Sequence, residues 1–248
     1  MTSTGHRLSD NPQPTILSGT PQPKTTRVFD WWNLIAFLAV ASLYVRAIFF
    51  TPTELRQGDA QKIFYVHPPA AFAAYVAYFL GAGMSVVYLW LRDSRADRLA
   101  RCAVEVAVLF NAVVVITGPL WAKPIWGVWW AWEDPRLTFT LFLLFIGFAY
   151  LVLRTAIEDT RMRARLSAVL AILGSLLIPF IHLTVYLFRS AHPMPIVWKP
   201  SAPSLPREML ITFIWAQLAF LALCASFVRS RYRVECQREE VDIARERV

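Results

Sequence analysis

Residues 166–188 read LSAVLAILGSLLIPFIHLTVYLF, an apolar run without aspartate, glutamate, lysine or arginine. A helix rising 1.5 Å per residue needs about 20 apolar residues to cross the hydrocarbon core of a membrane. Five further stretches are long and predominantly apolar, at approximately 31–50, 70–91, 102–121, 138–154 and 209–228. The sequence therefore predicts an all-α integral membrane protein with six transmembrane helices.

The composition and the spacing of these runs favour one membrane domain, over residues 30–229. Hydrophobic residues make up 56% of the chain and charged residues 17%, which is less charge than a soluble domain usually carries. Residues 1–29 are polar and proline-rich and contain no apolar signal segment, so we expect a disordered polar cytoplasmic tail. Residues 230–248 are expected to form a charged cytoplasmic C-terminal tail. The net charge of +8 is distributed beside the apolar runs, which argues against a nucleic-acid partner.

The distribution of basic residues predicts the orientation of the six helices. Seventeen lysines and arginines lie in the two tails and in the second-to-third and fourth-to-fifth connections, against seven in loops 51–69, 122–137 and 189–208. The positive-inside rule then predicts that both termini are cytoplasmic and that these three loops face outward. The basic segments are expected to contact membrane lipid.

A tryptophan-rich segment lies in the second outward loop, in residues 117–138, TGPLWAKPIWGVWWAWEDPRLT. Five tryptophans fall within twelve positions: Trp121, Trp126, Trp129, Trp130 and Trp132. One or two would be typical of an aromatic belt at the membrane interface. Five favour a platform for a large apolar ring system, because indoles offer broad faces with an N–H at the edge.

This segment resembles the tryptophan-rich "WWD" signature of heme-handling proteins, through WGVWW and RLT. The preceding TGPLWAKPIW is similar to the run found in the heme exporter protein C family (CcmC) of cytochrome c maturation. The resemblance implies an external loop over 121–138 in which Trp126, Trp129, Trp130 and Trp132 contact heme. Glu133 makes the motif one residue longer than usual, so that Asp134 is the best candidate for the signature acid and Glu133 the alternative.

Two histidines are candidate axial ligands of heme iron. His67, in YVHPPAAF, begins the second helix and His192 follows the fifth, both on the predicted outer side. Neutral imidazoles from separate segments can bind iron on opposite faces of heme, although an interfacial histidine often has only structural partners. The resemblance implies that His67 and His192 are the ligands. His182 and Met194 are the alternatives to His192, whose surroundings depart from the family pattern.

The resemblance further implies a function and a set of partners. The protein would bind heme noncovalently and transiently at the periplasmic face of the bacterial cytoplasmic membrane and deliver it to a periplasmic heme chaperone (CcmE-like). A small membrane subunit (CcmD-like) and ABC transporter subunits (CcmA/CcmB-like) are the other implied partners. Asp134 and Arg136 would order the loop or meet the heme propionates. Other outward cations are Arg189, Lys199 and Arg207.

Four other classes of protein are less consistent with the sequence. A secondary transporter or permease subunit would be expected to carry paired polar sites near the bilayer midplane, where only Asn111, His182 and Glu105 are candidates. A membrane b-type electron carrier usually holds its ligands within the spans. The related heme-attaching synthetases are larger, and the three cysteines form no CxxC pair, so we expect neither an enzyme nor a c-type cytochrome.

Overall fold

The computed structural model describes residues 30–188 and 191–246, and the predicted tail over 1–29 lies outside them. These residues form six α-helices and a short 3-10 helix, η1 (Asp59–Tyr65). The α-helices are α1 (Trp31–Phe49), α2 (His67–Leu91), α3 (Ser94–Trp126), α4 (Pro135–Ala156), α5 (Thr160–Leu187) and α6 (Arg207–Glu246). All six are long and apolar enough to cross a membrane. The predicted all-α, six-helix membrane fold is therefore confirmed.

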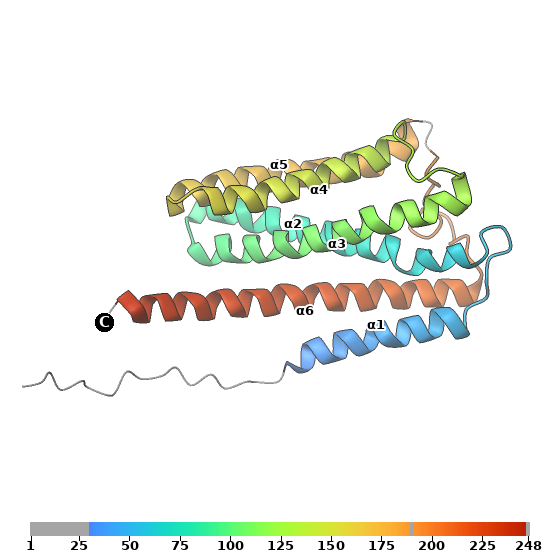
Figure 1. The fold of residues 1–248 in the computed structure, drawn as a ribbon, viewed down its shortest axis with the longest axis horizontal. Helices are drawn as coiled ribbons and strands as arrows, with labels where there is room; N and C mark the ends of the chain where they lie inside the picture. Colours follow the sequence, from blue (N-terminus) through green and yellow to red (C-terminus); the bar gives the residue numbers. More distant parts are fainter. Residues whose placement is uncertain (1–29, 189–190, 247–248) are drawn as a thin grey trace, which may run out of the picture. The chain divides into compact units, whose positions relative to one another are not determined.

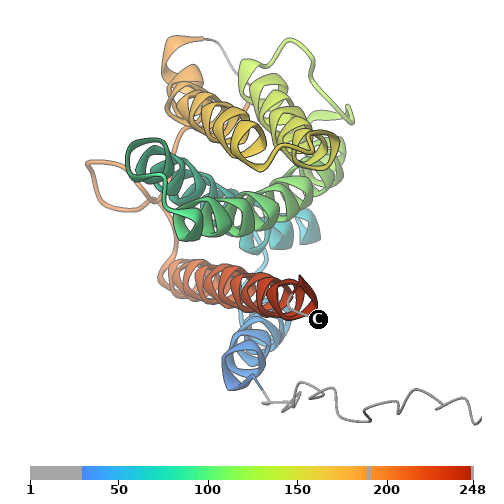
Figure 2. The ribbon, with the colours of Figure 1, turned by 90° about the vertical axis from the view of Figure 1, so that its left-hand side faces the viewer.

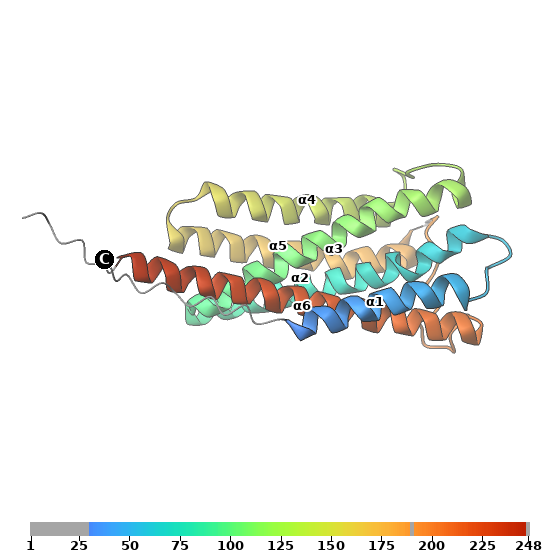
Figure 3. The ribbon, with the colours of Figure 1, turned by 60° about the horizontal axis from the view of Figure 1, so that its bottom comes forward.

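The helices of residues 31–246 form three layers (Figures 1 and 2). Helices α2 and α3 make the central layer, α4 and α5 cover one face of it, and α6 with α1 covers the other. Figure 3 shows the same helices running side by side along the bundle. Connections 50–66, 127–134 and, of the α5–α6 connection, residues 191–206 meet at one end, which we call the histidine end because it holds His67 and His192. The α2–α3 and α4–α5 turns lie at the opposite end.

Small residues allow the central helices to approach closely. The face of α2 in the core carries Ala70, Ala73, Ala74 and Ala77, all buried. A Cβ atom added to Gly147 of α4 would lie 2.5 Å from Val108 Cγ2 of α3, so that only glycine fits there. In a membrane, helix association is stabilised by such close van der Waals packing and not by the hydrophobic effect, because lipid tails are as apolar as the side chains.

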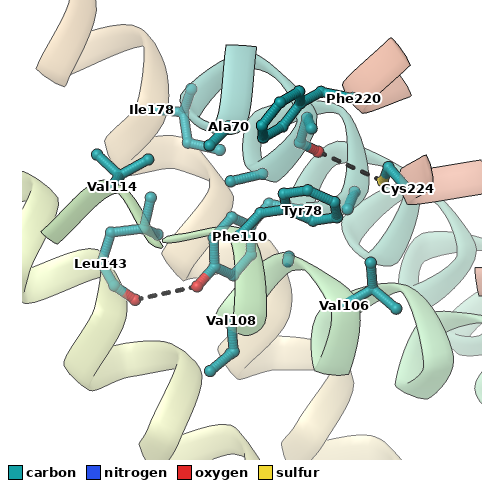
Figure 4. Close-up of a cluster of buried hydrophobic side chains, with 14 of the residues drawn as sticks. Ala70, Tyr78, Val106, Val108, Phe110, Val114, Leu143, Ile178, Phe220 and Cys224 are labelled. Carbon is teal, nitrogen blue, oxygen red and sulfur yellow. Dashed lines mark hydrogen bonds between the residues drawn. The ribbon is translucent and has the colours of Figure 1, made fainter. Parts of the chain in front are cut away.

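A polar contact joins three helices inside this core. The Tyr78 hydroxyl of α2 lies 3.5 Å from the carbonyl oxygen of Leu143 in α4 (Figure 4). Asn111 of α3 donates to the same hydroxyl at 3.5 Å. Asn111 thus makes a helix–helix hydrogen bond, the structural role that is usual for a buried amide in a span. It offers no support for a transporter site.

The ends of the helices follow from local sequence signals. Asp93, Asp134 and Asp159 are the N-caps of α3, α4 and α5, and each side chain accepts hydrogen bonds from backbone N–H groups of the first turn. Gly127 ends α3 in the left-handed conformation, with φ 77°, which glycine adopts without strain. Helix α3 therefore continues to Trp126, and the connection to α4 covers only residues 127–134 of the loop expected over 121–138.

Ion pairs at the opposite end extend α3 and α6 beyond the apolar runs. Residues 230–246, expected as a charged tail, continue α6 as a helix. Arg231 Nε lies 2.6 Å from Glu105 Oε2, and Arg101 Nη1 lies 2.9 Å from Glu235 Oε2. These ion pairs connect α6 to α3. Glu105 therefore has a structural role, and its presence in the third span does not require a transport function.

Candidate functional site

His67 is the first residue of α2 and lies against α3. Its Nδ1 atom is 2.9 Å from the hydroxyl oxygen of Thr117, and its ring meets the edge of Trp121 with centroids 5.9 Å apart. Trp121 is held in turn, because its indole N–H donates to Gln57 Oε1 at 3.0 Å. The loop before α2 and the last turns of α3 therefore fix the orientation of the His67 ring together.

His192 lies in the connection between α5 and α6 and is half-buried. Its backbone N–H donates to Asp134 Oδ2 at 3.1 Å, and its Nδ1 is 3.2 Å from the carbonyl oxygen of Pro193. Because a carbonyl can only accept, Nδ1 carries the proton and Nε2 has the lone pair. Desolvation, followed by the charge of Arg136, lowers the pKa of His192 to about 3, so that the ring is neutral at pH 7.

Asp134 connects the tryptophan segment to the His192 segment. Its Oδ1 accepts from the backbone N–H groups of Arg136 and Leu137 at the start of α4, while Oδ2 accepts from His192. The side chain is buried, with only 1% of Asp134 exposed, whereas Glu133 is exposed. Of the two acids that the sequence left open, Asp134 is the one with the buried, hydrogen-bonded position.

Arg136 and the two histidines lie in one electrostatic neighbourhood. His192 interacts with the charge of Arg136 and with His67, although the three residues come from α4, α2 and the α5–α6 connection. The Arg136 guanidinium makes no hydrogen bond or ion pair within residues 30–188 and 191–246. The site thus combines two imidazoles with a cation that no carboxylate of the described chain neutralises.

The other histidine and the other cations contribute less to this neighbourhood. His182 is exposed on α5 and contacts the ring of Tyr186, with centroids 6.5 Å apart. Lys199 donates to Ser204, and Arg207 is exposed at the start of α6. Arg189 lies outside the described residues.

The tryptophans form a partly exposed cluster between α3 and α4. Trp129 is 58% exposed and Trp132 is 69% exposed, while Trp126 and Trp130 are half-buried. The rings of Trp130 and Trp132 lie 5.9 Å apart at 54°, so they make a tilted pair and not a single flat surface. The Nε1–H group of Trp130 is buried and has no acceptor among the described residues. A bound molecule with an acceptor at its edge would satisfy this donor.

Sequence reasoning missed Thr117 and Gly118, which lie against His67, and Gln57, which holds Trp121 beside it. Thr117 lies 50 positions from His67, and no periodic pattern links the two. Gly118 lies next to the imidazole, since a Cβ atom added there would be 3.4 Å from His67 Cε1. The only sequence signal was the position of Thr117 and Gly118 at the start of the run that resembles the family.

These features define a class: a multi-pass, six-helix membrane protein with two histidines, an arginine and a tryptophan cluster at one end of its bundle. The family model described as heme exporter protein C matches residues 19–247, and the chain belongs to this family. The resemblance found in the tryptophan and histidine segments is thereby confirmed.

Individual relatives agree with this assignment over most of their length. The chain is 32% identical over 210 residues to heme exporter protein C of Haemophilus influenzae, covering 84% of this chain and 85% of the relative. It is 29% identical over 217 residues to heme exporter protein C of Escherichia coli, covering 85% and 86%. The relative from Rhodobacter capsulatus is 34% identical over 149 residues, with 60% and 61% covered.

Proposed function

We propose that the histidine end binds heme noncovalently, with His67 and His192 as axial ligands of the iron. The observation that carries this proposal is the convergence of two imidazoles, each hydrogen-bonded through Nδ1, beside Arg136. Imidazole is a common axial ligand of heme iron, and a hydrogen bond at one ring nitrogen orients the other toward a metal. The names of the relatives support heme as the molecule that is handled.

The residues present fit the chemistry of heme beyond its iron. The macrocycle is apolar and broad, and the exposed faces of Trp129 and Trp132 are suited to contact it. Its propionates need a cation, for which Arg136 has a guanidinium without a carboxylate partner in the described chain, and guanidinium binds carboxylate in a bidentate manner. The buried N–H of Trp130 is a further donor for an acceptor on the bound molecule.

In this proposal heme is cargo, held at the outer, periplasmic face of the cytoplasmic membrane and passed to a periplasmic heme chaperone during cytochrome c maturation. Asp134 orders the site by holding the His192 backbone, which leaves Arg136 for the propionates. Transfer requires that the heme edge stays accessible, and the exposure of Trp129 and Trp132 is consistent with such access. A small membrane subunit and ABC transporter subunits are the further partners we propose, without an enzymatic role for this chain.

The decisive experiment compares heme content among purified proteins. Wild-type protein extracted from membranes should carry heme with the absorption spectrum of a bis-imidazole complex, and the double variant His67→Ala, His192→Ala should carry almost none. An exposed histidine outside the proposed ligand pair serves as the matched control, so His182→Ala should keep the heme.

The outcomes separate this function from its alternatives. Absence of heme from the wild-type protein, or an unchanged spectrum in the double variant, would contradict bis-histidine binding and favour a transporter. Heme that stays bound through redox cycles and never passes to a soluble chaperone would indicate an electron carrier. Loss of heme in His182→Ala but not in His192→Ala would assign the second ligand to His182.

A further inference from the structure

The hydroxyl of Thr117 has more than one neighbour, and this determines its hydrogen-bonding role. Its oxygen lies 2.7 Å from the carbonyl oxygen of Val113 and 3.3 Å from that of Val114, one turn earlier in α3. A hydroxyl has a single hydrogen, and a carbonyl can only accept. The hydrogen of Thr117 is therefore directed to α3 itself, and toward His67 the oxygen offers a lone pair.

The protonation of the imidazole follows from this arrangement. At 2.9 Å from an oxygen that acts as acceptor, Nδ1 of His67 must be the nitrogen that carries the hydrogen. In a neutral imidazole the second nitrogen, Nε2, then has the lone pair. Besides Thr117, the imidazole has the backbone carbonyl of Val114 as a partner among the described residues, and a carbonyl likewise can only accept.

We infer that Thr117 is a positioning residue that fixes the Nδ1–H tautomer of His67 and so presents Nε2 to the iron of heme. Gly118 and Trp121 complete the holder, because the ring lies beside the Cα of Gly118 and against the edge of Trp121. Residues 117, 118 and 121 follow one another along one side of α3 at helical spacing. This inference rests on the proposed function for its ligand, but the tautomer itself is a property of the heme-free chain.

The first test uses the protein without heme. In protein labelled with ¹⁵N-histidine and reconstituted in lipid, the two ring nitrogens of His67 are assigned by their loss in His67→Ala. Wild-type protein and Thr117→Ser, which keeps the hydroxyl, should give the Nδ1–H pattern. Thr117→Val removes the acceptor while keeping the shape, and it should give a mixture of tautomers. An Nε2–H pattern in the wild-type protein, or an unchanged pattern in Thr117→Val, would overturn the inference.

The second test measures heme binding by the same variants. Loss of a hydrogen-bond partner behind a metal-bound histidine typically weakens metal binding by roughly 10–100-fold, and we expect a loss in this range for Thr117→Val. The reduction potential of heme bound to Thr117→Val should rise as well, because an imidazole without this hydrogen bond donates less electron density to ferric iron. Thr117→Ser should restore both properties. A wild-type affinity and potential in Thr117→Val would contradict the positioning role.

A matched control tests whether the effect is only structural. Thr184 of α5 is buried and donates to the Ile181 carbonyl oxygen at 2.7 Å, as Thr117 does to Val113, but no imidazole of the described residues bonds to it. Thr184→Val should therefore keep the heme affinity and the potential. If no variant and no wild-type sample binds heme while the ¹⁵N pattern is as expected, the proposed function fails and the tautomer assignment stands.

Discussion

The two ends of the bundle differ in how far their polar side chains are paired within the described residues. At the opposite end Arg154 makes a double contact with Asp97, with both N–O distances 2.8 Å, and Glu105 and Glu235 are paired with arginines of α3 and α6. At the histidine end Arg136 has no such partner in the described chain, the Trp130 N–H lacks an acceptor, and two tryptophans are largely exposed. The ion pairs at the opposite end stabilise the fold, whereas the histidine end, although Arg46 and Glu208 pair there at 2.9 Å, keeps donors that a ligand can satisfy.

The largest expected effect of a single substitution is on stability, at the ion-paired end. Arg154→Ala leaves the carboxylate of Asp97 without its bidentate partner in a poorly hydrated position, and the loss of a buried partner typically costs about 3–5 kcal/mol. The melting temperature in detergent should fall, and heme affinity per folded molecule should not change. The double variant Arg154→Ala, Asp97→Ala should recover part of the stability. A change in heme affinity would contradict the hypothesis that the ion-paired end contributes only to stability.

Asp134→Asn is expected to have the next largest effect, on heme binding. Asparagine caps helices as well as aspartate does, so α4 should remain stable. Its amide group, however, would direct N–H donors at the backbone N–H of His192, which now donates to Oδ2. We expect heme affinity to fall by roughly tenfold or more, in the range found for residues behind a metal ligand, with little change in melting temperature.

Asp134→Ala provides the comparison for this variant, because it removes the cap and the link to His192 together. It should lose about 1 kcal/mol of stability in addition to heme affinity. Wild-type heme binding in both variants would show that the link to His192 has no role in the site.

Arg136→Gln should weaken heme binding without weakening the fold. Its guanidinium has no partner to lose in the described residues, so the melting temperature should stay constant. An exposed ion pair is worth up to about 1 kcal/mol, which corresponds to a decrease in heme affinity of about fivefold. Arg207→Gln, at an exposed position on α6, is the control and should bind heme as the wild type does. Equal effects of the two substitutions would indicate a general electrostatic attraction.

The smallest effect is expected at Glu133, the residue that lengthens the tryptophan motif. It is exposed, and Asp134 makes the contacts of the cap and of the His192 link. Glu133→Gln should change stability by less than about 0.5 kcal/mol and leave heme affinity unaltered. A loss of heme comparable to that of Asp134→Asn would reverse the assignment of the two acids.

The sequence predicted the candidate site in outline but not its internal order. The predicted topology placed His67, the tryptophan segment and His192 on the outer side of the membrane. In the structure these segments lie at the same end of the bundle. The extent of α3 was harder to predict, because the span was expected over 102–121 and Pro124 suggests a loop, although the helix continues through it to Trp126. The helical continuation of α6 beyond residue 229 was not predicted either, because the residues there are charged and not apolar. In the structure this part of α6 forms ion pairs with α3.

The sequence by itself determined the six spans, because a membrane requires about 20 apolar residues for each helix and leaves a signal that local composition reveals. It also indicated the family, because WGVWW and RLT are each an uninterrupted run of residues. Only the tertiary structure decided that Thr117 accepts from His67 and that Asp134 holds His192. These partners lie 50 and 58 positions apart, and a hydrogen bond depends on positions within a few tenths of an ångström, which only the packing of the helices and of the α5–α6 connection defines.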